Sequence, residues 1–89
     1  MSPEREALDQ LLAGDMPLSV VASLFPDEAH ARRAIGALLA AGELNLRDAE
    51  GAALSSWQLR ELERQPGSWR ADTQHRLAIT DTGVRRIGG

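Results

Sequence analysis

The residues of this 89-residue chain that could carry out chemistry are few, and their spacing suits neither catalysis nor metal binding. His30 and His75 are its two histidines, and nothing pairs either with a nucleophile as a general base. The chain has no cysteine, and its histidines are not one helical turn apart, so no zinc site is predicted. Glu61 and Glu63 are two residues apart, which places them on opposite sides of a helix. We therefore expect that the protein is not an enzyme and that it holds no cofactor and no metal.

Arginine is the residue type best suited to bind a ligand, because all ten cationic side chains are arginines. Residues 1–31 carry one arginine and six acids, whereas residues 64–89 carry five arginines and two acids. Guanidinium groups bind phosphates and guanine edges in a forked geometry. This distribution predicts one face suited to phosphate groups, although the formal net charge of the whole chain is −3.

The same arginines also have ordinary structural explanations. Glu28 and Arg32 are four residues apart, which is the spacing of an ion pair on a helix surface. Arg85 and Arg86 fall near the end of an expected helix, where positive charge offsets the helix dipole. The sequence leaves these explanations open beside the ligand-binding one.

The elements that must position these side chains are mostly helices, because leucine and alanine recur at helical spacing. Good N-cap residues precede three of them: Ser2, Asp27 and Ser55. Ser55 also forms a capping-box pair with Gln58, and Pro66 is expected to break the helix that it begins. The predicted helices span residues 3–13, 19–25, 27–41 and 55–65, and a final helical turn after residues 81–83 carries Val84 and Ile87.

Short strands are expected in the second half of the chain. Leu44 and Leu46 alternate with polar residues, as on a half-buried strand. Residues 48–51 have turn chemistry, and residues 52–54 would return as a short strand. A further strand is predicted at residues 76–80, with Leu77 and Ile79 facing inward. The predicted fold class is therefore mainly α (α+β), in a single domain over residues 1–89.

The two tryptophans are expected in different surroundings. Leu59 and Leu62 would face the core from the helix over residues 55–65, with Trp57 beside them. Trp69 follows a Pro-Gly pair and falls in an expected exposed loop. Because large aromatic side chains in exposed loops often anchor contacts, Trp69 is predicted to be the better interface residue of the two.

Two short motifs resemble those of the winged helix-turn-helix superfamily. LAAGEL at residues 39–44 resembles the end of its recognition helix, and ITDTG at residues 79–83 resembles the beginning of its last helix. The resemblance covers most of the chain in outline and is that of a small prokaryotic or phage-type protein. It implies three N-terminal helices, a small β-sheet and an inserted helix around residues 55–65.

By that resemblance the chain would be a small transcriptional regulator that binds duplex DNA. Residues 27–41 would be the recognition helix, and residues 47–52 or 66–75 would be the wing. A homodimer is expected, because one module of this size contacts few base pairs. Arg33 would contact bases, and the other DNA-binding residues would be His30, Arg32, Arg47, Arg70, Arg85 and Arg86.

The same helix also supports the alternative of a protein-interaction or oligomerisation module. Its outer face is rich in small residues, which cannot hydrogen-bond base edges but let another helix approach closely. The interface residues would then be Ala29, Gly36, Ala37, Ala40 and Trp69. Burial of this face against the helix over residues 55–65 is the competing explanation.

A cytoplasmic location without a membrane partner is expected. The first residues lack the basic-then-apolar layout of a signal peptide, and no apolar run approaches the roughly 20 residues of a membrane span.

Overall fold

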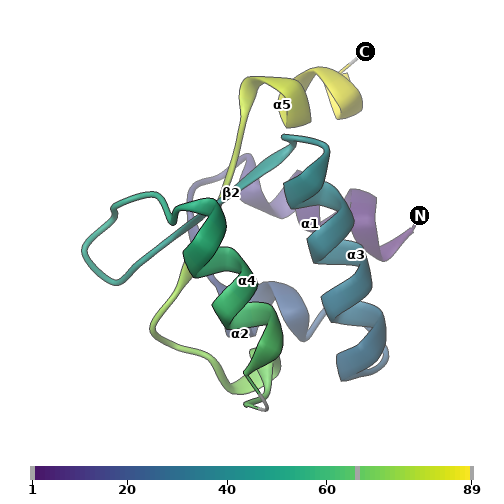
Figure 1. Cartoon of the computed structure of the whole chain (residues 1–89). Helices are drawn as coiled ribbons and strands as arrows, with labels where there is room; N and C mark the ends of the chain where they lie inside the picture. Colours follow the sequence, from purple (N-terminus) through teal and green to yellow (C-terminus); the bar gives the residue numbers. More distant parts are fainter. Residues whose placement is uncertain (1, 66, 89) are drawn as a thin grey trace.

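A computed structural model describes residues 2–65 and 67–88 as an α+β fold with five α-helices, one 3-10 helix and a three-stranded antiparallel sheet (Figure 1). In chain order the elements are α1 (Pro3–Leu11), β1 (Met16–Pro17), α2 (Leu18–Ala22), α3 (Glu28–Ala40), β2 (Leu44–Arg47), α4 (Ser56–Arg64), η1 (Trp69–Ala71), β3 (Arg76–Ile79) and α5 (Asp81–Gly88). The expected helix-breaking role of Pro66 lies outside the described residues.

Three helices, α1, α3 and α4, begin at the caps that the sequence predicts. The Ser2 side chain accepts a hydrogen bond from the backbone of the first turn of α1. The Asp27 carboxylate accepts one from the backbone N–H three residues on, at 2.7 Å, and so starts α3. Ser55 and Gln58 form both hydrogen bonds of the capping box at α4. Each cap satisfies N–H groups that a helix leaves without a partner in its first turn.

The sheet has the strand order β1-β3-β2, with β3 in the middle. Leu77 of β3 lies opposite Met16 on one side and opposite Leu46 on the other. The return strand expected at residues 52–54 is wrong, because only an isolated bridge joins Arg47 to Ala53. Alanine packs poorly on a strand, and β3 supplies the better partner for β2.

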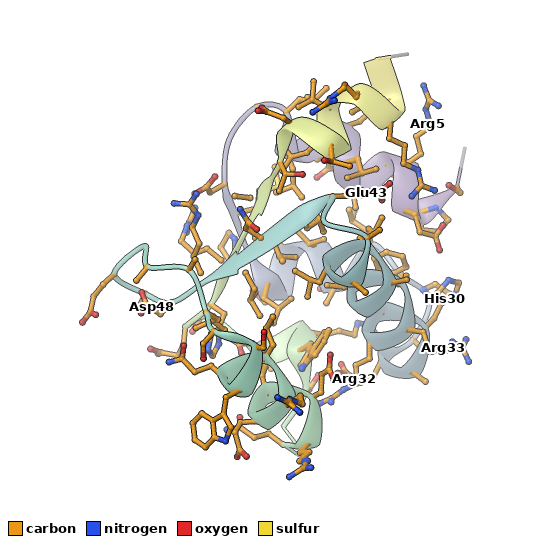
Figure 2. The ribbon with its side chains drawn as sticks, turned by 45° about the horizontal axis from the view of Figure 1, so that its top comes forward. Arg5, His30, Arg32, Arg33, Glu43 and Asp48 are labelled. Atoms are coloured by element: carbon orange, nitrogen blue, oxygen red, sulfur yellow. The ribbon has the colours of Figure 1, made fainter. Side chains whose placement is uncertain are left out.

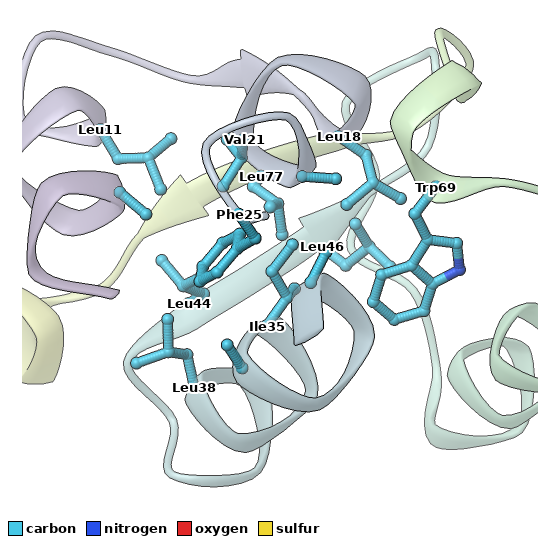
Figure 3. Packing of buried hydrophobic residues seen from close by; sticks show 14 of the residues in the cluster. Leu11, Leu18, Val21, Phe25, Ile35, Leu38, Leu44, Leu46, Trp69 and Leu77 are labelled. Carbon is cyan, nitrogen blue, oxygen red and sulfur yellow. The ribbon is translucent and has the colours of Figure 1, made fainter. Parts of the chain in front are cut away.

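The core lies between the sheet and the first three helices (Figure 3). Phe25 and Ile35 face Leu44 and Leu77 across it, and all four are nearly inaccessible to solvent. Val20 of α2 is 44% exposed. The buried residues of α2 are Leu18, Val21 and Ala22, and Phe25 is buried in the segment that follows the helix.

The burial of the two tryptophans is the reverse of the expected one. Trp69 is 2% exposed, so its placement in an exposed loop is wrong, and Trp57 is 66% exposed. The segment around η1 folds back onto α3, which carries the Trp69 ring inside (Figure 3). Trp57 lies on the side of α4 away from the core-facing Leu59 and Leu62.

Candidate interaction surface on helix α3

Helix α3 has one buried face and one outer face, as its periodicity predicts. Ala31, Ala34, Ile35 and Leu38 are buried. Ala29, Arg33, Ala37 and Ala40 are exposed, and Gly36 is half-buried among them. The outer face therefore presents small side chains around a single guanidinium, and Figure 2 shows Arg33 pointing away from the body of the protein.

Helix α4 lies beside α3 but does not cover its outer face (Figure 1). A groove of about 320 Å³ separates them, lined by Gly36, Leu39 and Ala40 of α3 and by Ser56, Leu59, Arg60 and Glu63 of α4. A Cβ atom added at Gly36 would meet no atom within 4 Å. Burial of this face by the protein's own α4 is thus only partial, and the groove is open to another molecule.

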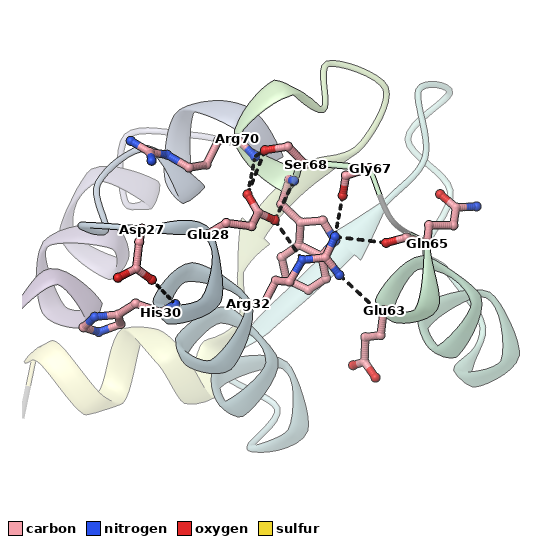
Figure 4. A network of polar contacts seen from close by, with 10 residues as sticks. Asp27, Glu28, His30, Arg32, Glu63, Gln65, Gly67, Ser68 and Arg70 are labelled. Atoms are coloured by element: carbon pink, nitrogen blue, oxygen red, sulfur yellow. Dashed lines mark hydrogen bonds and ion pairs between the residues drawn. The ribbon is translucent and has the colours of Figure 1, made fainter.

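Arg32 is half-buried and bridges α3 and the end of α4 (Figure 4). Its Nε lies 2.8 Å from the Glu28 Oε2 in the i,i+4 pair that the sequence allowed. Its two terminal nitrogens donate to the backbone carbonyls of Glu63 at 3.0 Å, of Gln65 at 3.1 Å and of Gly67. Because these donors are occupied, Arg32 is poorly placed to bind a ligand on the outer face.

Glu28 completes this network by anchoring η1. Its carboxylate accepts hydrogen bonds from the Ser68 hydroxyl and the Trp69 N–H, both at 2.8 Å, and from the Arg70 N–H at 3.3 Å. Burial raises the pKa of Glu28, but the hydrogen bonds from Trp69, Ser68 and Arg32 outweigh it and lower the pKa to about 2. Arg32 also lies over the Trp69 ring, 5.0 Å from its centroid.

Two further candidates for DNA contacts have acidic neighbours. His30 Nε2 lies 3.6 Å from Glu4 Oε1. The pKa of Glu4 is lowered chiefly by a backbone hydrogen bond, with a contribution from His30. Arg86 donates to Glu43 Oε2 at 2.6 Å. Each of these candidates therefore has a carboxylate beside it, which would repel a phosphate group.

The remaining candidates are dispersed over the molecule. Arg47 donates to the Gly51 carbonyl at 3.4 Å, at the turn that follows β2. Arg70 is exposed on η1, beside the beginning of α3, whereas Arg85 is exposed on α5. The seven arginine and histidine side chains predicted to contact DNA therefore come from four different elements, α3, β2, η1 and α5.

The two motifs behind the family resemblance contact each other, which the sequence did not indicate. The Thr80 hydroxyl donates to the Gly42 carbonyl, and the Thr80 N–H donates to the Glu43 carbonyl at 3.0 Å. Gly83 packs so tightly here that a Cβ atom would lie closer than van der Waals contact to the Glu43 carbonyl oxygen and 2.7 Å from Ile79 Cγ1. This junction fixes α5 against the end of α3.

Comparison with known proteins adds no relative: no protein-family model, no curated protein and no solved structure matches the chain. Over the residues described, no helix combines the length and apolar character needed to cross a membrane. Fold and site together define a small α+β protein in which the half-exposed α3 borders a groove formed with α4.

Proposed function

We propose that this protein is a non-catalytic protein-interaction module of winged-helix type, which receives a helix of a partner protein in the groove between α3 and α4. The observation that carries the proposal is the composition of this groove. Gly36 and Ala40 are the small residues that line it on α3, while the partly buried Leu39 and Leu59 supply apolar surface. Small residues let a partner backbone approach, and an amphipathic helix buries its apolar face in such a groove.

The charges at the groove suit a protein better than a nucleic acid. Arg60 and Glu63 line it with opposite signs, and Arg33 lies on the adjoining outer face of α3. A partner helix with both acidic and basic residues beside its apolar stripe would complement this arrangement. A phosphate backbone would instead meet the Glu63 carboxylate in the groove.

The winged-helix part of the proposal is supported by the order of the elements. Helices α1, α2 and α3 precede β2 and β3, and β1 joins the sheet beside β3. In this arrangement α4 and η1 stand within the connection between β2 and β3, where the resemblance implies a wing.

The proposal is tested by selecting helical peptides from a displayed library against the full chain. We expect amphipathic helices to be enriched, and Ala40→Glu to weaken their binding by at least about tenfold, because it buries an unpaired charge in the contact. Glu6→Gln, on the exposed part of α1, is the control and should leave binding unchanged. Failure to enrich any helix, or equal binding by the Ala40→Glu variant, would contradict the proposal.

Duplex DNA binding is the second candidate, favoured by the exposed Arg33 on α3 and by the helix order. Fluorescence anisotropy with generic duplex DNA at two ionic strengths separates the two functions. We expect no micromolar binding at low salt. Binding that weakens steeply with salt and is reduced by Arg33→Ala would establish the DNA interface in place of the protein one.

A further inference from the structure

A second hollow lies on the opposite side of α4 from the groove just described. Its volume is about 240 Å³, and it is lined in part by Asp48 of the turn after β2, by Trp57, Glu61 and Leu62 of α4, and by His75. The groove beside α3 is lined by the other side of α4, with Ser56, Leu59, Arg60 and Glu63. The two surfaces are thus separate, and binding in this hollow is independent of the proposed function.

The charged groups that line this hollow favour a cation. Asp48 and Glu61 are carboxylates, and no arginine is found among the described residues of the lining. Asp48 is held in place because its Oδ1 accepts hydrogen bonds from the N–H groups of Glu50 at 2.9 Å and of Ala52 at 3.0 Å. His75 is paired through its Nδ1 with Asp72 Oδ2, at 2.8 Å. The fixed charge of the lining is therefore negative.

Trp57 adds an aromatic surface to these carboxylates. At 66% exposure it is the most exposed of the large apolar side chains that the structure describes, although it lies on a helix whose other side packs on the core. The face of an indole ring attracts cations, and a planar guanidinium also stacks on it. Water contact with so large an apolar side chain is unfavourable, and a ligand that covers the ring would relieve it.

We propose that this hollow binds an arginine side chain presented by a partner protein. The guanidinium would stack on Trp57 and donate hydrogen bonds to the carboxylates of Glu61 and Asp48. The methylene groups of the arginine would lie against Leu62 in the wall. Arginine fits better than lysine because its planar, forked donors match both the ring face and a carboxylate.

The test is an NMR titration of the 15N-labelled full chain with the tripeptide acetyl-Gly-Arg-Gly-amide. We expect saturable shifts of the Trp57 indole N–H, identified by its loss in Trp57→Phe, and of the amides of residues 57–62. The matched peptide with citrulline has the same shape without the charge, and it should bind at least about tenfold more weakly. Absence of saturable shifts, or equal binding by the citrulline peptide, would overturn the proposal.

Two variants with the same change in charge locate the site on α4. Glu61→Gln should weaken the arginine peptide at least about tenfold, because a charge-assisted hydrogen bond is lost. Glu63→Gln lies on the other side of the helix and should leave its affinity unchanged. If both variants weaken binding of the arginine peptide equally, the effect comes from the overall charge of the protein, and the proposed site is wrong. Equal binding of the corresponding lysine peptide would overturn its assignment to a guanidinium.

Discussion

At the scale of single residues, two helical glycines differ in the space around them: Gly83 of α5 has no room for a side chain, whereas Gly36 of α3 has room. Gly83→Ala should lower the free energy of unfolding by about 1–3 kcal/mol, because its Cβ would overlap the backbone of Glu43. Gly36→Ala should raise the free energy of unfolding by up to about 1 kcal/mol, since alanine favours a helix and meets no atom there. Urea unfolding followed by circular dichroism measures both. A Gly83→Ala variant as stable as the parent chain would contradict the tight junction.

The hydrogen bonds to Glu28 predict how stability depends on pH. Its pKa falls from an ordinary 4.5 to about 2 in the folded protein, so the unfolded chain binds more protons between these values. Stability should therefore rise as pH increases from about 2 to 5, and be lost as pH falls through that range. In Glu28→Gln this part of the pH dependence should disappear, with a loss of about 1–3 kcal/mol at neutral pH.

Chemical denaturation at several pH values between 2 and 7 provides the measurement for Glu28. Glu63→Gln is the control, because the Glu63 side chain takes no part in the network and its backbone carbonyl is retained. The explanation fails if Glu28→Gln keeps the pH dependence of the parent chain.

At the scale of elements, hydrogen bonds from the Arg32 side chain hold the end of α4 against α3. Leu62 is the buried residue of α4, and three carbonyls at or beyond its last turn receive hydrogen bonds from Arg32. Arg32→Ala should raise amide hydrogen-exchange rates in the second half of α4 by about tenfold or more, because these charge-assisted bonds are lost. Arg33→Ala, one residue on but exposed, should leave these rates unchanged. Unaltered exchange in Arg32→Ala would show that apolar packing alone holds α4.

The elements that the sequence predicted are those whose signals are local. The caps at Ser2, Asp27 and Ser55 and the leucine spacing depend on neighbours a few residues away, and they place the helices correctly. Strand β1 was missed because it has two residues, one of them Pro17, and forms only by pairing with β3. The burial of Trp69 was missed for the same kind of reason, since Glu28, forty-one residues away, anchors its backbone.

The candidate site was predictable in part. The helical spacing of α3 predicted that small residues occupy its outer face, and the i,i+4 spacing predicted the ion pair of Arg32 with Glu28. The sequence offered the packing of α4 on α3 only as an alternative, and it did not reveal that Trp57 would face solvent next to Asp48. Both features depend on how residues 48–75 fold back.

At the scale of the whole molecule, one core joins helices, sheet and η1. Leu77 lies in the middle strand and is fully buried. Leu77→Ala should destabilise the protein by about 2–5 kcal/mol, a large share of the 5–15 kcal/mol typical of a domain. Val84→Ala, at a position 41% exposed, should change stability by no more than about 0.5 kcal/mol. Thermal unfolding followed by far-UV and near-UV circular dichroism should give one shared transition, and separate transitions would contradict a single core.

Helix α4 has a hollow on each side and is attached to the rest of the protein by Leu59, Leu62 and Arg32. A molecule bound in either hollow would restrict the motion of α4. The ordering entropy lost at the first binding event would then not be lost again at the second. Two ligands that never touch would thereby assist one another through α4, and by linkage each would raise the affinity of the other by the same factor.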